Sequence, residues 1–165
     1  MVELGPGAVQ RVALDVDIAA LQSRLVLCYT GEPRNSGTNN WEITKRHIDG
    51  DRFIFDCFER IRDTAVDMRE ALERGDWDAV GRAIGREWEN RKQLAPGVTT
   101  PAIEGLIARA TAAGATAAKV CGAGGGGCMF CYGPASKRAD IAAALAGGGA
   151  RLLDYTFERH GLARG

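Results

Sequence analysis

The stretch of this sequence best suited to binding chemistry is a glycine-rich loop between two apolar segments. From Cys121 to Cys128 it reads Cys-Gly-Ala-Gly-Gly-Gly-Gly-Cys, and apolar runs at 115–121 and 127–132 predict a strand on each side. Glycine is favoured where φ must be positive, or where a backbone or ligand comes too close for a Cβ. Such a loop can also present several N–H groups to an anion. A flexible connector between two hairpin strands is the alternative interpretation.

Two familiar glycine motifs do not describe this loop. Gly122, Gly124 and Gly127 match the letters of the dinucleotide fingerprint G-x-G-x-x-G. That fingerprint opens a helix and is followed about 20 residues later by an acid, whereas this loop opens a strand and is followed there by Gly147–Gly149. The P-loop is excluded because Cys128 and Met129 stand where Lys and Ser/Thr are required.

A second candidate site follows the apolar run Arg24–Tyr29, which predicts a buried strand ending in a polar loop. Arg34 in that loop is a candidate contact for phosphate or sugar hydroxyls, since such loops commonly meet ligands; a solvated loop arginine is the alternative. Ser36 is a second candidate, and it is equally suited to cap a helix over 37–48.

The cysteines and histidines do not predict a metal site or a disulfide framework. There are five cysteines, an odd number in a chain of this length. Cys128 and Cys131 form a C-x-x-C, but residues three apart in a strand point to opposite faces and cannot share one metal. His47 and His160 are far apart in the sequence. We therefore predict no metal ligand, and we assign no catalytic residue.

Length and composition are those of one globular domain over residues 1–165. Hydrophobic residues make up 45% and charged residues 25% of the chain, which permits a sizeable core. Lys+Arg and Asp+Glu balance at 21 each, so the sequence does not indicate a nucleic-acid partner. Apolar stretches are too short to span a membrane, and the N-terminus lacks signal-peptide features. We expect a cytoplasmic protein.

The expected elements form an α+β sandwich of ferredoxin-like, split βαβ type. We predict a weak edge strand at 12–16, and a first helix-bearing crossover enlarged by an inserted helical hairpin at 51–95. In the longest helix the inward residues are predicted to be those at spacings of three and four, namely Ile54, Phe58, Ile61, Ala65, Met68 and Leu72. The hairpin turns at Gly75 and Asp76, and Thr100 caps the next helix. A further helix after Pro134 and a last strand at 151–158 complete the plan.

The run Lys119–Gly127 resembles the third, glycine-rich motif of the superfamily of galactokinase, homoserine kinase, mevalonate kinase and phosphomevalonate kinase, abbreviated GHMP. The segments 29–36 and 88–94 are similar to the branch that acts on sugars and sugar phosphates, including heptose phosphate kinases. The resemblance covers nearly the whole chain as a C-terminal domain, which is ferredoxin-like in the family. It implies that Arg34 and Ser36 contact substrate and that the cleft residues on the cofactor side are Gly122, Ala123, Gly124, Gly125 and Gly126.

The same resemblance implies a missing part. Family kinases bind ATP phosphates through a Pro-x-x-x-Gly-Leu-Gly/Ser-Ser-Ser/Ala motif in an N-terminal domain, and Pro101, Gly105 and Leu106 imitate only its opening. ATP and Mg²⁺ are therefore implied for the complete kinase and are not expected to be held by this chain alone. We expect an inactive substrate-side half that needs an N-terminal domain and a small-molecule sugar or sugar phosphate, and that self-associates as a homo-oligomer when uncovered. The rival interpretation is a stand-alone ferredoxin-like metabolite-binding or regulatory module.

Overall fold

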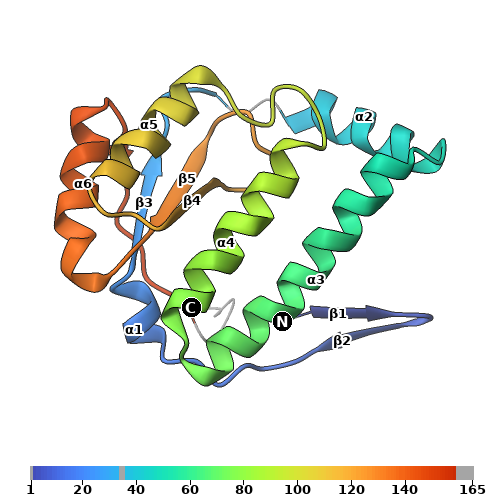
Figure 1. The fold of residues 1–165 in the computed structure, drawn as a ribbon, viewed down its shortest axis with the longest axis horizontal. Coiled ribbons are helices and arrows are strands. Elements are labelled where there is room, and N and C mark those ends of the chain that lie inside the picture. The colour runs from blue at the N-terminus through green and yellow to red at the C-terminus, as the bar shows by residue number, and fades with distance from the viewer. Residues whose placement is uncertain (1, 34–35, 159–165) are drawn as a thin grey trace, which may run out of the picture.

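The computed structural model describes residues 2–33 and 36–158, and places helices on one side of an antiparallel sheet (Figure 1). In chain order the elements are β1 Val2–Gly5, β2 Ala8–Arg11, α1 Ile18–Gln22, β3 Leu25–Tyr29, α2 Ser36–Ile48, α3 Arg52–Arg74, α4 Trp77–Lys92, α5 Pro101–Ala112, β4 Ala117–Val120, β5 Cys128–Tyr132, the 3₁₀ turn η1 Ala135–Lys137, α6 Arg138–Gly147 and β6 Arg151–Leu152.

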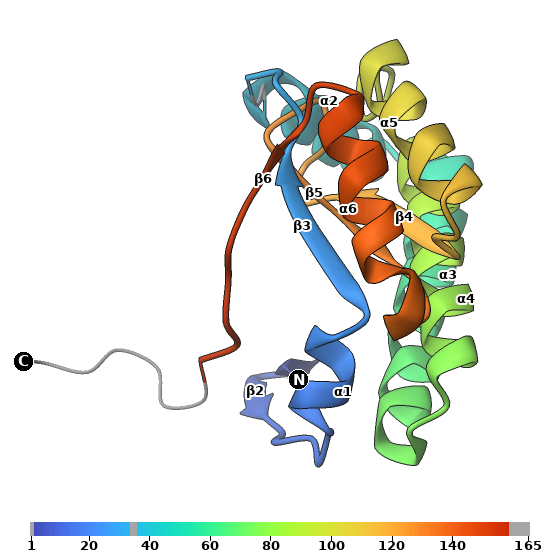
Figure 2. The same cartoon turned by 90° about the vertical axis from the view of Figure 1, so that its left-hand side faces the viewer.

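The main sheet has the strand order β4-β5-β3-β6, and every neighbouring pair is antiparallel. The first strand of this sheet, β3, therefore lies between the third and the fourth, which is the order of a ferredoxin-like sandwich. Helices α5 and α6 pack on one face, and α4 runs beside β4 (Figures 1 and 2). The predicted fold class, including the helical hairpin α3–α4 in the first crossover, is confirmed.

Strand alternation builds the core between this face and the helices. Val26 and Cys28 of β3 lie opposite Cys131 and Met129 of β5, and all four side chains are buried. Apolar residues of α5 and α6 complete the layer: Ile103, Leu106, Ile141 and Leu145. Burying such side chains stabilises each by about 1.5–3 kcal/mol relative to leaving it exposed.

The helix ends follow local signals in the sequence. Asp51 and Asp76 cap α3 and α4 through their carboxylates, and Thr100 caps α5 ahead of Pro101. Gly75 ends α3 with φ 65°, a left-handed conformation that glycine adopts without steric cost. These predicted boundaries are confirmed to within a residue or two.

The predicted inward face of α3 is only partly right. Ile54, Ile61 and Met68 do pack inward, but Phe58 is 37% exposed and Ala65 is also at the surface. Cys57 and Thr64 are buried instead, because the packed seam follows positions 54, 57, 61, 64, 68 and 71. Thr64 can be buried because its hydroxyl donates to the carbonyl of Arg60 at 2.7 Å.

Two strand predictions and one helix boundary need correction. Residues 12–16 are not a strand; the N-terminal strands are β1 and β2, which pair only with each other within the described residues. The predicted last strand at 151–158 shrinks to the two residues of β6, because only Cys28 and Tyr29 pair with it in the ladder. Helix α2 begins at Ser36 itself rather than after it.

Across the residues that the structure describes, none of the helices has the length and apolar character needed to cross a membrane.

Candidate functional site

The glycine loop joins β4 to β5 and is fixed at its base by a hydrogen bond from the Cys121 N–H to the Cys128 carbonyl at 2.8 Å. Five of its glycines have positive φ: 76° at Gly122, 89° at Gly124, 77° at Gly125, 143° at Gly126 and 80° at Gly127. Residues with a Cβ rarely adopt this conformation. The run of glycine is therefore required by the backbone path, which is not that of a loose connector.

The loop lies between two other loops and is bonded to both. The N–H of Gly125 donates to the carbonyl of Val98 at 2.8 Å, and the N–H of Gly127 donates to the carbonyl of Glu32 at 2.9 Å. The N–H and the hydroxyl of Thr30 donate to the carbonyl of Gly127, at 2.9 and 3.0 Å. The loop that follows β3 and the loop that precedes α5 thus hold the glycine loop in place.

The backbones are too close for side chains at two loop positions. A Cβ on Gly124 would lie 2.4 Å from the carbonyl oxygen of Val98, and one on Gly126 would lie 2.6 Å from the carbonyl oxygen of Pro33. Both distances are far inside van der Waals contact. Gly124 and Gly126 therefore satisfy the close-approach condition as well as the positive φ.

Part of the loop keeps free hydrogen-bond donors. Among contacts made within residues 2–33 and 36–158, the N–H groups of Gly122 and Ala123 donate to no acceptor. Gly122 is an exposed residue and Ala123 is half-buried. Successive free N–H groups in a glycine turn can accept the oxygens of an anion such as phosphate.

A polar contact joins the start of α5 to the loop after β3, which also holds the glycine loop. The hydroxyl of Thr100 donates to the carboxylate of Glu32 at 2.6 Å and accepts from the Ile103 N–H at 3.2 Å. The N-terminus of a helix carries partial positive charge, which favours anions and acidic side chains nearby. Glu32, Val98 and Thr100 were not predicted as site residues; Glu32 lies in the same polar loop as Arg34, and Thr100 was identified only as a helix cap.

The predicted site residues come together only in part. Pro33 and the glycine loop are in contact, so the loop that carries Arg34 does lie beside Gly126. Arg34 itself is outside the described residues. Ser36 is the first residue of α2, and its side chain is likewise beyond what the structure describes. The roles of Arg34, Ser36 and the residues 122–126 remain predictions.

The nearby thiols are unsuited to nucleophilic or metal chemistry. Burial, and then the neighbouring Cys128, raises the pKa of Cys28 to about 11. Burial also raises the pKa of Cys131 to about 12 and moves that of Cys121 upward. Protonated thiols are poor nucleophiles and poor ligands. In the described chain no three His, Cys, Asp or Glu side chains gather as a metal centre would require.

Other charged candidates are held in ion pairs. Lys119, three residues before the loop, pairs with Glu87 of α4, and Arg91 contacts the same carboxylate at 2.5 Å. These side chains help to line a hollow of about 330 Å³ formed by residues of α3, α4, β4 and β5. A larger apolar groove of about 400 Å³ between the sheet, α3 and α4 shares no residue with the glycine loop.

The sequence of this chain is similar to a protein-family model and to kinases of known function. The family model "GHMP kinases C terminal" matches residues 68–150. The chain is 28% identical over 142 residues to the D-glycero-alpha-D-manno-heptose 7-phosphate kinase of Campylobacter jejuni, covering 86% of this chain and 41% of that protein. It is 31% identical over 105 residues to the L-fucokinase/L-fucose-1-P guanylyltransferase of Bacteroides fragilis, covering 64% of this chain and 11% of that protein.

A solved structure supports the fold. The Lin0012 protein from Listeria innocua superposes with a TM-score of 0.75 at 17% identity, over 82% of this chain and 39% of that chain. At this identity the likeness shows the fold alone. The chain spans about two fifths of the length of the heptose phosphate kinase and about a tenth of the fucokinase.

Proposed function

Because this chain belongs to the GHMP kinase family, we propose that it is the C-terminal, substrate-side part of an ATP-dependent kinase that phosphorylates a sugar or a sugar phosphate. The relatives named as a heptose 7-phosphate kinase and an L-fucokinase support this class of substrate. The chain matches 41% of the heptose kinase, so the complete activity requires a further, ATP-binding part.

The observation that carries the proposal is the rigid glycine loop with its free donors. The N–H groups of Gly122 and Ala123 have no acceptor within the described residues, while hydrogen bonds to Val98 and Glu32 fix the rest of the loop. Phosphoryl transfer depends mainly on positioning and on stabilising charge, so fixed donors beside a phosphate are useful there. Residues 122–126 would line the cleft near the nucleotide, and Arg34 and Ser36 would contact the sugar side.

ATP and Mg²⁺ are the cofactors of the proposed kinase. The free N–H groups at Gly122 and Ala123 fit phosphate oxygens, which are strong acceptors. Mg²⁺ prefers carboxylate oxygens and phosphates, and it would neutralise charge on the transferring group. We assign the magnesium ligands and most phosphate contacts to the ATP-binding part, and we assign no catalytic residue to this chain.

The test is reconstitution. This chain is mixed with a matching N-terminal, ATP-binding half of a GHMP kinase, and ADP release is measured with Mg²⁺ and a panel of sugars and sugar phosphates. We expect turnover with at least one of them, and loss of that turnover in the Gly124→Ala mixture but not in the Gly149→Ala mixture.

Two results would count against the proposal. One is no ADP release above background from two folded pieces; the other is an upstream reading frame that encodes nothing related. Either would favour the stand-alone metabolite-binding module.

A further inference from the structure

The cysteines of this chain differ in their access to solvent. Cys28, Cys57 and Cys131 are fully buried, whereas Cys121 and Cys128 are half-buried. A thiol must reach solvent to react with a small molecule, so these two are the cysteines placed to be modified in the folded protein. They stand at the two ends of the glycine loop, one directly after β4 and the other at the start of β5.

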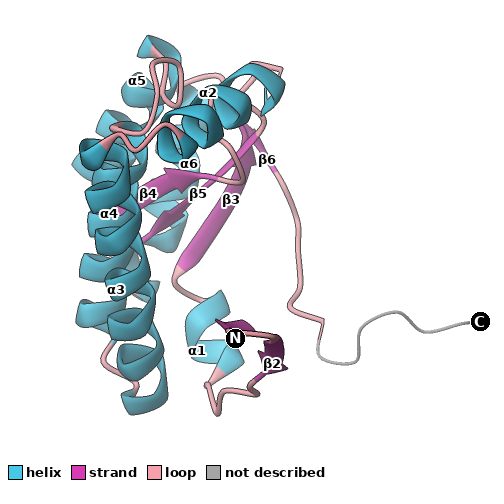
Figure 3. Cartoon of the chain, turned by 90° about the vertical axis from the view of Figure 1, so that its right-hand side faces the viewer, coloured by secondary structure: helices cyan, strands magenta, loops and turns pink. Residues whose placement is uncertain are grey.

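The two half-buried cysteines also lie opposite each other in the sheet. In the β4–β5 ladder Val120 is paired with Met129, and the hydrogen bond from the Cys121 N–H to the Cys128 carbonyl at 2.8 Å continues this register by one residue. Figure 3 shows the two strands as neighbours. Directly opposed residues of an antiparallel ladder point to the same face, with Cα atoms about 4.5–5.5 Å apart. Disulfides join Cα atoms about 4.4–6.8 Å apart, so the backbone is already arranged for one.

The folded sheet favours this pair over the C-x-x-C pair of the sequence. Cys128 and Cys131 lie three residues apart in β5, so their side chains point to opposite faces, and Cys131 is buried in the core. In an unfolded chain, by contrast, their short separation makes Cys128 and Cys131 the easiest thiols to join. The identity of the pair that forms therefore reports whether the folded sheet directs the reaction.

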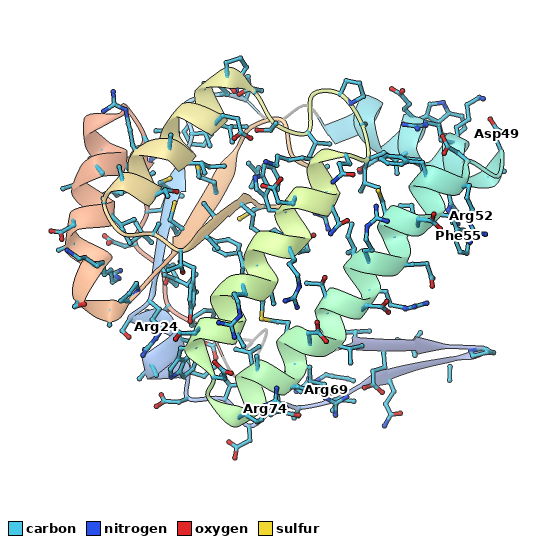
Figure 4. All side chains as sticks on the ribbon, viewed as in Figure 1. Arg24, Asp49, Arg52, Phe55, Arg69 and Arg74 are labelled. Carbon is cyan, nitrogen blue, oxygen red and sulfur yellow. The ribbon has the colours of Figure 1, made fainter. Side chains whose placement is uncertain are left out.

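The surroundings of Cys121 make its reaction with molecules in solution slow. Burial, and then the neighbouring Cys128, raise the pKa of Cys121, and the ammonium group of Lys119 partly opposes them. Figure 4 shows Arg69 and Arg74 at the lower end of the view, away from the loop between β4 and β5 in its upper half, so these cations are not placed to favour a thiolate at Cys121. Attack on a directly opposed residue needs no encounter with a second molecule, and this proximity offsets the small fraction of thiolate.

We propose that Cys121 and Cys128 are a redox modification site, which a small-molecule disulfide such as glutathione disulfide converts into a disulfide across the base of the glycine loop. The ring closed in this way contains residues 122–127, so the modification acts on the loop that carries the free N–H groups of Gly122 and Ala123.

The reaction is two successive thiol–disulfide exchanges. The thiolate of Cys128 attacks one sulfur of glutathione disulfide, which forms a mixed disulfide and releases one glutathione thiolate that takes up a proton. Cys121 then loses its proton and attacks the Cys128 sulfur, which releases the second glutathione. Two protein thiols are thus oxidised by two electrons, and one glutathione disulfide is reduced to two glutathione molecules.

The experiment compares the folded chain with the chain unfolded in urea, each reduced first and then incubated with glutathione disulfide. After unfolding, the remaining thiols are blocked with iodoacetamide, and chymotrypsin cleaves after Phe130 to separate Cys131 from Cys121 and Cys128. Mass spectrometry identifies which cysteines are bridged, blocked or joined to glutathione. The variants Cys121→Ser and Cys128→Ser each remove one partner, and Cys131→Ala is the matched control because it removes a thiol of β5 outside the pair.

In the folded parent chain we expect a peptide that contains Cys121 and Cys128 and has lost two hydrogen atoms, with the buried cysteines blocked. Dithiothreitol should reverse the loss. Cys131→Ala should form the same bridge, whereas neither serine variant should form it, and Cys121→Ser should retain glutathione on Cys128. In urea the bridge between Cys128 and Cys131 should prevail.

Several results would overturn the proposal. One is a folded parent chain that keeps all five thiols free at a concentration of glutathione disulfide that oxidises the unfolded chain. Another is a folded-state bridge between any other two cysteines, or between two copies of the chain. A third is the same distribution of bridges in the folded and the unfolded chain, because the sheet would then have no part in choosing the pair.

Discussion

At the scale of single residues, Gly124 combines two constraints that can be separated by mutation. Its φ of 89° disfavours any Cβ, and that Cβ would meet the carbonyl oxygen of Val98 at 2.4 Å. Gly149 has a similar φ of 90° but open space around it. Gly149→Ala should thus cost only the strain of about 1–2 kcal/mol, and Gly124→Ala should cost about 1–3 kcal/mol more. Urea unfolding of both variants measures the difference, and equal losses would contradict the close packing of the loop.

The Glu87 carboxylate should matter more than an exposed acid, because it neutralises two cations in a half-buried position. Its side chain is 14% exposed, and it pairs with Lys119 and Arg91. We expect Glu87→Gln to destabilise the protein by about 1–3 kcal/mol, since both cations lose their charged partner. The control is Glu70→Gln, which breaks an exposed pair with Arg74 and should cost no more than about 0.5 kcal/mol. Chemical denaturation measures the free energy of unfolding of both variants. Similar small losses would show that the ion pairs of Glu87 stabilise the protein no more than a surface pair does.

The buried thiols predict a loss of stability at alkaline pH. The folded pKa values of Cys28 and Cys131, about 11 and about 12, lie above the ordinary value of 9.0. Below pH 9 the thiols are protonated in both states, and above it the unfolded chain loses protons that the folded chain retains. The free energy of unfolding should therefore fall as pH rises from 9 toward 11. Urea melts at pH 8, 9 and 10.5 test this, and a Cys28→Ala/Cys131→Ala variant should show a shallower fall. An equally steep fall in that variant would assign the effect to other groups.

The candidate site was predictable where the requirement was local to the residue. Positive φ in the glycine loop follows from the composition of the loop alone, and the structure shows it at Gly122 and Gly124–Gly127. The contacts of Val98 and Thr100 were not predictable, because they depend on how the loop before α5 lies against the glycine loop and the loop after β3. A valine or a threonine in a loop does not by itself predict which other loop it contacts.

At the scale of elements, Thr100 links helix α5 to the loop after β3. Its hydroxyl accepts from the Ile103 N–H and donates to Glu32. Thr100→Val keeps the shape but loses both bonds, so it should lower stability by about 1–2 kcal/mol, whereas Thr100→Ser keeps both and should lie near the parent. Thermal melts compare the two. If valine and serine behave alike, the hydroxyl does not hold this junction.

Caps and turns of the elements were easier to predict than their packed faces. Asp51, Gly75 and Asp76 act within a few residues of chain, so the sequence alone determines them. The face of α3 depends on where α4 and the sheet lie, and hydrophobicity wrongly favoured Phe58 over Cys57. The β1–β2 hairpin was missed although Pro6-Gly7 is a turn signal, since each strand has only four residues and residues 8–11 are all exposed, which leaves no buried apolar pattern to indicate a strand.

At the scale of the whole molecule, the domain has its glycine loop and its N-terminal hairpin at different places. The glycine loop lies between the loops around Val98 and Pro33, whereas Val2 and Val9 lie on the separate hairpin.

The prediction for the whole chain is that it does not turn over ATP by itself. Removal of one oxyanion-stabilising donor typically costs an enzyme about 10²–10³ in rate, so a chain without the phosphate-binding part should stay near the uncatalysed background. Within the described residues, two of the charged residues that could contribute are already paired: Lys45 with Asp49 at 2.6 Å, and Lys119 with Glu87. A coupled ADP-release assay on the purified chain, with Mg²⁺ and sugar, sugar-phosphate, mevalonate and homoserine substrates, provides the measurement. Turnover that persists across independent preparations and is lost in Lys119→Met would contradict this prediction, because it would require Lys119 to leave Glu87 and act on a phosphate within this domain.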